Sequence, residues 1–176
     1  MPNPFDDFDM RNFWEKSEYA TKEYVGRPVT PEMIEKVEDT LGYKLPASYI
    51  ALLKVQNGGI PKNTNHPMNE RTSWAEDHVA LTGIFGLDST KTYSILGGLG
   101  SEFMKVEWGY PDIGIYICDC PSAGHDMIAL DYSDCGKFGE PKVVHIDQEF
   151  DYKITFVASD FESFIRSLVH DSEYDE

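Results

Sequence analysis

Hydrophobic positions recur at helical spacing in three stretches of the chain. In "VTPEMIEKVEDTLG" the apolar side chains repeat every three or four residues, at Ile34, Val37 and Leu41. Thr30 and Pro31 are typical of a helix start, and Gly42 is typical of a helix end. A second helix is predicted after Pro46, with an inner stripe formed by Tyr49, Leu52 and Leu53, and "NGG" at 57–59 ends it. A third is predicted from Ser159, which can form a capping box with Glu162.

Between the second and third helices the apolar pattern changes to that of strands. Strands are predicted at 79–87, 113–120, 126–132, 142–149 and 153–158. The segment 113–120 is apolar on both faces, as expected of a central strand, and 126–132 is its expected hairpin partner. Short connections favour antiparallel pairing. The predicted fold class is therefore α+β: a largely antiparallel meander with a central hairpin, packed against two N-terminal helices and one C-terminal helix.

The chain shows no repeat and no long linker, which predicts one main domain. We expect residues 1–28 to dock on the body as an N-terminal strap, because they carry Phe13, Trp14, Tyr19 and Tyr24. Residues 29–170 are expected to form the domain, and residues 171–176 an acidic tail. The glycines of "GGLGSEF" (97–103) lack the lysine and hydroxyl residue of a phosphate-binding loop, so we expect a flexible loop there.

Charge narrows the possible partners. The chain has 15 Lys and Arg against 31 Asp and Glu, a formal net charge of −16. No basic footprint for nucleic acid is present, and an anionic membrane would repel the chain. A basic protein partner would be attracted and its encounter accelerated. Solubility alone is the alternative explanation of the acidity.

The number of cysteines and the lengths of the apolar segments indicate in which cellular compartment the protein is expected. Cys118, Cys120 and Cys135 form an odd set, which does not indicate a framework of disulfides. The first ten residues contain no apolar run of the signal-peptide type, and no segment is apolar over the length of a bilayer. We therefore expect a reduced, cytoplasmic protein.

Two motifs resemble those of the SUKH superfamily. "LGYKLPASYIALLKVQNGG" carries the first at Leu41, Gly42, Leu45, Pro46, Tyr49, Asn57, Gly58 and Gly59. "SAGHDMIALD" is similar to the second at Gly124, Asp126, Leu130 and Asp131. His125 departs from the glycine that is common in the family at that position. The similarity covers roughly residues 30 to 168 and marks the expected domain as SUKH-like.

The resemblance carries its own functional expectations. The superfamily includes fungal regulators of cell-wall glucan synthesis, the Smi/Knr group, and bacterial immunity proteins that neutralise toxins, often nucleases. It therefore implies an α+β, non-catalytic, protein-binding module without a cofactor, with a basic toxin domain as partner. A regulatory scaffold of the fungal type is the alternative.

Several residue types in the chain also suggest a metal site or a catalytic site. Cys118 and Cys120 could join His125, Cys135 and His145 around zinc, but a Cys-x-Cys pair on a strand lacks the usual ligand spacing. Ser122, His125 and Asp126 have the residue types of a hydrolase triad, yet they share one turn, and triad members normally converge from separate segments. Asp77 and His78 could form an acid–base pair or simply a surface loop. We predict no metal site and no enzymatic activity, and keep a metal-dependent enzyme only as an unfavoured alternative.

Binding of a partner protein is the remaining interpretation of the loops in which acidic and aromatic residues occur together. Aromatic rings beside carboxylates suit an interface with a basic protein, because the rings supply buried area and the acids pair with Arg or Lys. The predicted partner-binding residues are Trp74, Glu76, Asp77, His78, Glu107, Trp108, Tyr110, Asp112, Asp119, His125 and Asp126. The alternative is that Trp108 and Tyr110 belong to the core and the acids are only solvated.

Overall fold

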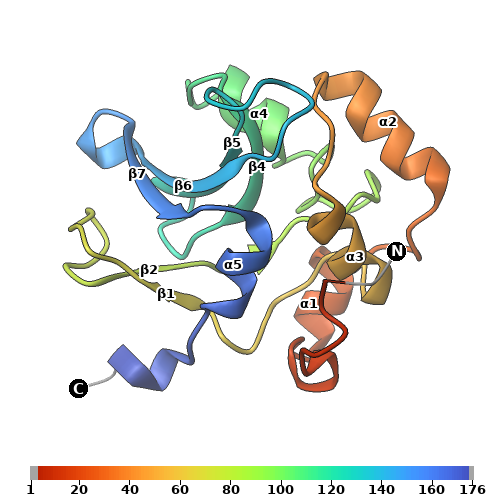
Figure 1. Cartoon of the computed structure of the whole chain (residues 1–176), viewed down its shortest axis with the longest axis horizontal. Helices are drawn as coiled ribbons and strands as arrows, with labels where there is room; N and C mark the ends of the chain where they lie inside the picture. The colour runs from red at the N-terminus through yellow and green to blue at the C-terminus, as the bar shows by residue number, and fades with distance from the viewer. Residues whose placement is uncertain (1–3, 175–176) are drawn as a thin grey trace.

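A computed structural model of the chain describes residues 4–174 (Figure 1). Residues 1–3 of the expected strap and residues 175–176 of the expected tail lie outside the described part. The α-helices are α1 (Glu18–Glu23), α2 (Pro31–Leu41), α3 (Ala47–Val55), α4 (Ser101–Val106) and α5 (Phe161–Arg166). Three short 3₁₀ turns are η1 (Met10–Asn12), η2 (Gln148–Phe150) and η3 (Asp171–Tyr174).

The main sheet is a five-stranded antiparallel meander in the order β3-β4-β5-β6-β7. Its strands are β3 (Gly83–Ile84), β4 (Gly114–Asp119), β5 (Asp126–Asp131), β6 (Lys142–Asp147) and β7 (Lys153–Ala158). Helix α5 contacts β6, β7 and α3, while α4 contacts β4. A separate two-stranded sheet pairs β1 (Asn65–Pro67) with β2 (His78–Ala80). The predicted α+β class, with a main antiparallel sheet and a central hairpin, is confirmed.

Helix α2 begins and ends where the sequence predicts, whereas α5 begins later. The Thr30 side chain accepts a hydrogen bond from the Met33 N–H at 3.2 Å, and Gly42 ends α2 at φ +80°. The prediction for α5 was wrong by one residue, because Asp160 caps this helix by accepting from the Ser163 N–H at 2.8 Å. Ser159 therefore does not form the expected capping box.

The predicted strand at 79–87 divides between the two sheets. Residues 78–80 pair with β1, whereas Gly83 and Ile84 pair with the end of β4. Gly83 lies against the N-terminal segment, because a Cβ at this position would come within 2.2 Å of the Tyr24 ring. The tyrosine ring thus occupies the side-chain space of the strand, a packing constraint that periodicity does not reveal.

The expected loop at 97–103 contains the start of a helix. Helix α4 begins at Ser101, whose hydroxyl accepts a hydrogen bond from the Tyr116 N–H of β4 at 3.0 Å. Met104 is buried against the sheet. Tertiary packing therefore stabilises a short helix after a glycine-rich segment that by itself favours a loop.

The N-terminal residues that the structure describes pack on the body. Phe5, Phe13, Trp14 and Tyr24 are buried in the main core, and the Glu15 N–H donates to the Ile60 carbonyl at 2.7 Å. Burial of several aromatic side chains is the main force that holds such a segment in place. Whether residues 1–28 and 171–176 are units apart from the 29–170 domain stays a prediction.

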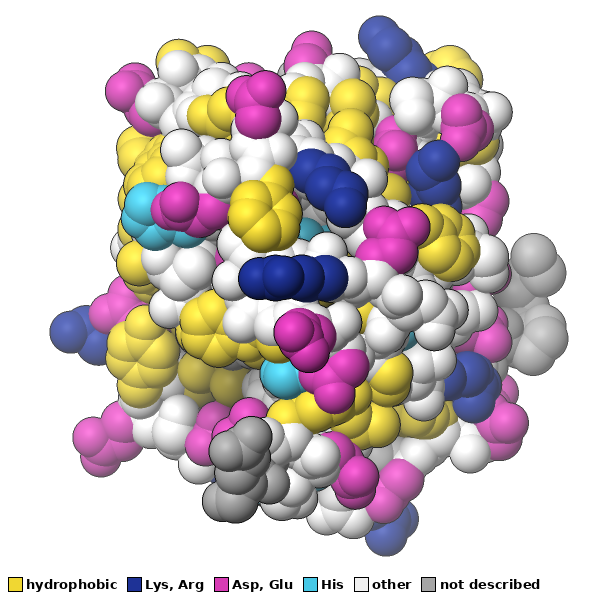
Figure 2. All heavy atoms as spheres, turned by 90° about the vertical axis from the view of Figure 1, so that its left-hand side faces the viewer, with side chains coloured by type: hydrophobic (Ala, Val, Ile, Leu, Met, Phe, Trp, Pro, Cys, Tyr) yellow, Lys and Arg dark blue, Asp and Glu magenta, His cyan; other side chains and the backbone are white. Residues whose placement is uncertain are grey.

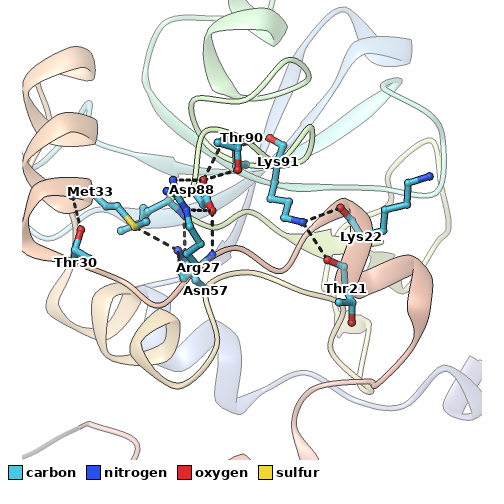
Figure 3. Close-up of polar contacts among 11 residues, drawn as sticks. Thr21, Lys22, Arg27, Thr30, Met33, Asn57, Asp88, Thr90 and Lys91 are labelled. Atoms are coloured by element: carbon cyan, nitrogen blue, oxygen red, sulfur yellow. Dashed lines mark hydrogen bonds and ion pairs between the residues drawn. The ribbon is translucent and has the colours of Figure 1, made fainter.

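Asn57 connects the N-terminal segment to the exit of β3 (Figure 3). Its amide donates to the Arg27 carbonyl at 2.7 Å, and its side-chain oxygen accepts from the Leu87 N–H at 2.7 Å. Next to it, the guanidinium of Arg27 pairs in a two-pronged manner with buried Asp88, at 2.9 and 3.0 Å. Asn57 thus satisfies backbone groups that would otherwise be buried without a partner.

Candidate partner-binding site

Buried hydrogen bonds hold the β4–β5 turn, residues 120–125, in place. The Ser122 hydroxyl donates to one carboxylate oxygen of Asp126, and His145 Nε2 lies 2.7 Å from the other. The Asp126 N–H donates back to the Ser122 oxygen at 3.0 Å. Asp126 is only 1% exposed and His145 is fully buried. These bonds fix the turn on β5 and β6.

This geometry bears on one predicted contact residue, Asp126, and on the disfavoured alternative of a hydrolase triad. Asp126 was predicted to contact a partner, but its buried carboxylate is already held by groups of its own chain. A hydrolase triad needs the histidine between the serine and the acid. Here the acid lies between Ser122 and His145, and His125 instead faces Glu149, with its Nδ1 2.7 Å from a carboxylate oxygen.

Trp108 and Tyr110 hold the other side of the turn. The Tyr110 hydroxyl donates to the Gly124 carbonyl at 2.6 Å, and the ring is 3% exposed. Tyr110 is therefore a core residue, and its contact with a partner stays a prediction that its burial disfavours. Gly124 has φ +101°, and a Cβ here would lie 2.8 Å from the indole Cζ2 of Trp108. The glycine allows the indole to pack directly on the turn.

On one side of the turn lies a hollow of about 470 Å³, here called the polar hollow. Trp74, which is 42% exposed, comes from the loop between β1 and β2. That loop is fixed because the Ser73 N–H and hydroxyl donate to Asp147 at 2.8 and 2.6 Å. The hollow is lined by Arg71, Ser73, Trp74, Ser122, His125, Asp126, Glu149 and Phe150.

On the other side of the turn lies a smaller and more enclosed space of about 270 Å³, here called the apolar cavity. Helix α4, the turn and the end of β4 contribute its walls. A single carboxylate, that of Asp119, opens into it. The residues that line it are Tyr93, Leu99, Phe103, Met104, Trp108, Asp119, Ala123, Gly124 and Met127.

Asp119 has an unusual electrostatic environment. Both of its carboxylate oxygens lie within 2.9 Å of the Tyr24 hydroxyl, at 2.9 and 2.8 Å. Burial raises its pKa to about 6, and the hydrogen bonds from Tyr24 and the backbone offset only part of that rise. The same burial raises the pKa of the Tyr24 hydroxyl far above its ordinary value. Among the ion pairs of residues 4–174, none includes Asp119.

The remaining predicted contact residues are dispersed. Asp77 and His78 pair with each other at 2.8 Å, and the His78 ring stacks on Tyr174 of η3, with 3.7 Å between ring centroids. Glu76 is exposed beside them. Glu107 and Asp112 flank the segment of Trp108 and are exposed. Asp112 pairs with Lys105 at 2.9 Å. The structure thus gathers Trp74, Trp108, Asp119 and His125 around the turn, and leaves the others at its margin or away from it.

The surface around the polar hollow is mixed rather than uniformly acidic. Figure 2 looks onto the side of the molecule that carries the β1–β2 loop and the η2 turn. Hydrophobic side chains there alternate with acidic ones, and two basic side chains lie near the centre of the view. Phe150 and Phe156 are among the exposed large apolar residues, at 43% and 60%. Both apolar and charged groups are therefore available to a partner on this side of the molecule.

The structure offers no zinc site among residues 4–174. No group of three His, Cys, Asp or Glu side chains in that range is arranged to hold a metal ion. Cys118 and Cys120 are buried free thiols, and burial raises the pKa of both well above the ordinary value. They therefore serve as small core residues. In the same range no helix has the length and apolar character that crossing a membrane requires.

Comparison with known proteins adds the family. The family model SUKH_6, described as SMI1-KNR4 cell-wall, matches residues 31–165, which include both motifs. The chain belongs to the SMI1-KNR4 family. No curated protein matches the chain. Members of the SMI1-KNR4 family are generally non-catalytic, and membership supports a module of the immunity or regulator type that binds a partner.

The SMI1-KNR4 motif residues support the frame beneath the site. Tyr49 is fully buried and donates its hydroxyl hydrogen bond to the Phe85 carbonyl. Leu45 and Leu130 are core residues, and Asp131 accepts from the Ser133 N–H at 2.9 Å. The turn that precedes β5 keeps positive φ at Ala123 and Gly124, while His125 lies outside the left-handed region. The histidine at 125 therefore leaves the tight turn intact.

Several residues of the site were not found from the sequence. Tyr24, Tyr93 and Phe103 come from segments far from the turn, and no local pattern connects them to it. Glu149 and Phe150 lie after β6 in the 3₁₀ turn η2, whose first two residues were expected to continue the strand that was predicted at 142–149. Their only signal was the acidic and aromatic residue types directly after an apolar strand.

Proposed function

We propose that the chain is a non-catalytic immunity protein that binds and neutralises a basic toxin domain, a nuclease in the leading hypothesis, in the cytoplasm. Occlusion is the proposed mechanism: the acidic protein covers the positive surface with which the toxin grips its substrate. The observation that carries the proposal is the surface on both sides of the β4–β5 turn, where Trp74 and Trp108 lie beside Glu149 and Asp119.

Charge supports this function at long range. A net charge of −16 attracts a basic domain before contact and disfavours nucleic acid as a direct ligand. At short range the turn is held by the bonds of Ser122, Asp126 and Tyr110, so the surface is formed before binding. A preformed surface loses little conformational entropy on association.

The polar groups of the turn support a role without catalysis. Asp126 separates Ser122 from His145, and His125 pairs with Glu149 at the surface. Among these groups of the turn, no nucleophile lies next to a base in the order that acyl transfer requires. Turnover of a small substrate that is lost on His125→Ala, in a protein that remains folded, would contradict the proposal.

Association kinetics test the electrostatic part directly. The rate at which the chain associates with a partner isolated from its native host should fall at least tenfold between about 0.02 M and 0.5 M salt. The reason is that exposed charges are screened at high salt. Trp108→Ala should chiefly raise the dissociation rate, since it removes buried contact area. Asp39→Asn, on an exposed face of α2 away from the turn, is a surface control and should leave the dissociation rate unchanged. Equal association rates at both salt concentrations would refute electrostatic steering.

A regulatory scaffold is the second candidate function. The description of the matching family model, SMI1-KNR4 cell-wall, favours it. The same surface would then bind a component of a host pathway rather than a toxin. A neighbouring gene for a large secreted protein with a nuclease tail favours immunity, and an unbiased pull-down from the native host distinguishes the two partners.

A further inference from the structure

We propose that the apolar cavity receives an arginine side chain of the partner protein, whose guanidinium pairs with Asp119. This inference rests on the proposed function, because it assigns one contact of the same binding surface. It goes further by naming the chemical group that enters and the carboxylate that selects it.

The first argument is the chemistry of the cavity walls. The cavity has a volume of about 270 Å³ and is lined mainly by apolar and aromatic side chains, among them Leu99, Phe103 and Trp108. Such walls suit the methylene stem of a long side chain, and aromatic rings also attract a cation at their faces. A single charged group in a mainly apolar space fixes the orientation of what enters it.

The second argument is the charge of Asp119. Its pKa of about 6 leaves the carboxylate ionised at pH 7, although burial disfavours the charge. Its hydrogen-bond donors within the chain are neutral: the Tyr24 hydroxyl, which lies near both oxygens, and the backbone N–H groups of Asp119 and Gly83. No lysine, arginine or histidine of residues 4–174 pairs with this carboxylate. A buried anion that no cation of its own chain neutralises is the complement of a cationic donor.

The third argument favours arginine over lysine. A guanidinium is less strongly hydrated than an ammonium group, it stacks on aromatic rings, and its planar fork can bond a carboxylate through two N–H groups. The carboxylate lies in the same cavity as the aromatic side chains of Tyr93 and Trp108. Arginine is also enriched among the residues that contribute most to protein interfaces.

Neighbouring residues hold the Asp119 carboxylate and the aromatic walls of the apolar cavity in place. Tyr24 fixes the carboxylate, and its ring stacks on Tyr93 at 4.8 Å between centroids. Trp108 packs on Gly124, and its backbone carbonyl accepts a hydrogen bond from the Tyr152 hydroxyl. A preformed cavity of this kind binds a side chain without first having to open.

The test is a titration of the folded chain with the peptide acetyl-Gly-Arg-Gly-amide, followed by NMR. We expect saturable shifts of the Trp108 indole N–H and of the amides of Ala123, Gly124 and Met127. The dissociation constant should be on the order of 1 mM, as is reasonable for one isolated side chain. Trp108→Phe assigns the indole signal among the three tryptophans.

Three comparisons make the result specific. A citrulline peptide, which is neutral but has nearly the same shape, should bind at least tenfold more weakly to the unaltered protein. Asp119→Asn should weaken binding of the arginine peptide by a similar factor. Asp39→Asn, the control that removes an acid from α2, should leave that binding unchanged. The asparagine oxygen can still accept from Tyr24, so the fold is expected to survive, and the citrulline comparison does not depend on that variant.

Other outcomes overturn the inference. Absence of saturable shifts, shifts located away from the cavity, or equal binding of the citrulline peptide would each refute the arginine site. Equal binding of a lysine peptide would refute the assignment to arginine. None of these results affects the salt-dependence test of the proposed function. The arginine site and the proposed function can therefore be refuted separately.

Discussion

Replacement of Asp119 by asparagine should change how the stability of the protein depends on pH. In the folded protein the pKa of Asp119 is raised from the ordinary value of 3.8 to about 6, mainly by burial. The folded state therefore holds this proton between about pH 4 and pH 6, where the unfolded state has lost it. Stability from this group is fully present below about pH 4 and is lost as pH rises through about 6.

The pKa difference sets the size of the effect. At 1.36 kcal/mol per pH unit, the rise from 3.8 to about 6 corresponds to at most about 3 kcal/mol of lost stability at pH 7. Asp119→Asn removes the ionisation but can keep an acceptor for the Tyr24 hydroxyl. The variant should therefore gain stability relative to the original chain as pH rises, by about 2–3 kcal/mol between pH 4 and pH 7.

Urea unfolding at pH 4, 5, 6 and 7, followed by tryptophan fluorescence, measures this difference. Asp39→Asn is the control, since it removes the same charge from an exposed position on α2 and should show little pH dependence. A free energy difference between the original chain and Asp119→Asn that stays constant from pH 4 to pH 7 would refute the reasoning. So would a difference of the opposite sign. A stabilising Asp119→Asn variant would identify a residue that the fold does not need, as is typical of binding sites.

Three further variants test the frame of the site, each by urea unfolding at pH 7. Asn57→Ala should destabilise the protein by about 2–4 kcal/mol, because two short hydrogen bonds are lost and the Leu87 N–H stays buried without a partner. Asp88→Asn should cost about 1–2 kcal/mol. The Arg27 guanidinium holds the Asp88 pKa well below its ordinary value of 3.8. When unfolding is repeated at lower pH, this cost should therefore begin to shrink below about pH 4 and be lost only as pH falls through the lowered pKa. Gly124→Ala should cost about 1–3 kcal/mol, because φ is +101° and the new Cβ would meet the Trp108 ring at 2.8 Å. An unchanged unfolding midpoint for any of them would contradict its assigned role.

The fold was largely predictable because its strong elements carry local signals. The cap at Thr30, the end of α2 at Gly42 and the apolar run of β4 depend on residues that are neighbours in the chain. The elements that were missed depend on distant residues. Helix α4 is stabilised by packing of Met104 and by the bond between Ser101 and β4, which no local pattern shows.

The site was predictable only in part, for a similar physical reason. Aromatic and acidic residue types identified Trp108 and Asp119, but burial of a side chain depends on the whole fold. Tyr110 and Asp126 carry the same residue types and are directed inward, where each forms intramolecular hydrogen bonds. The Tyr24 hydroxyl that holds Asp119 comes from 95 residues away in the sequence.

Hydrogen exchange of the chain, alone and bound to the partner isolated from its native host, tests most directly whether the surface around the β4–β5 turn binds that partner. The account predicts that backbone amides at 103–109 and 119–127 exchange more slowly in the complex, whereas those of α2, at 31–41, do not change. Slower exchange confined to α2 and α3, with unchanged exchange at 119–127, would contradict it.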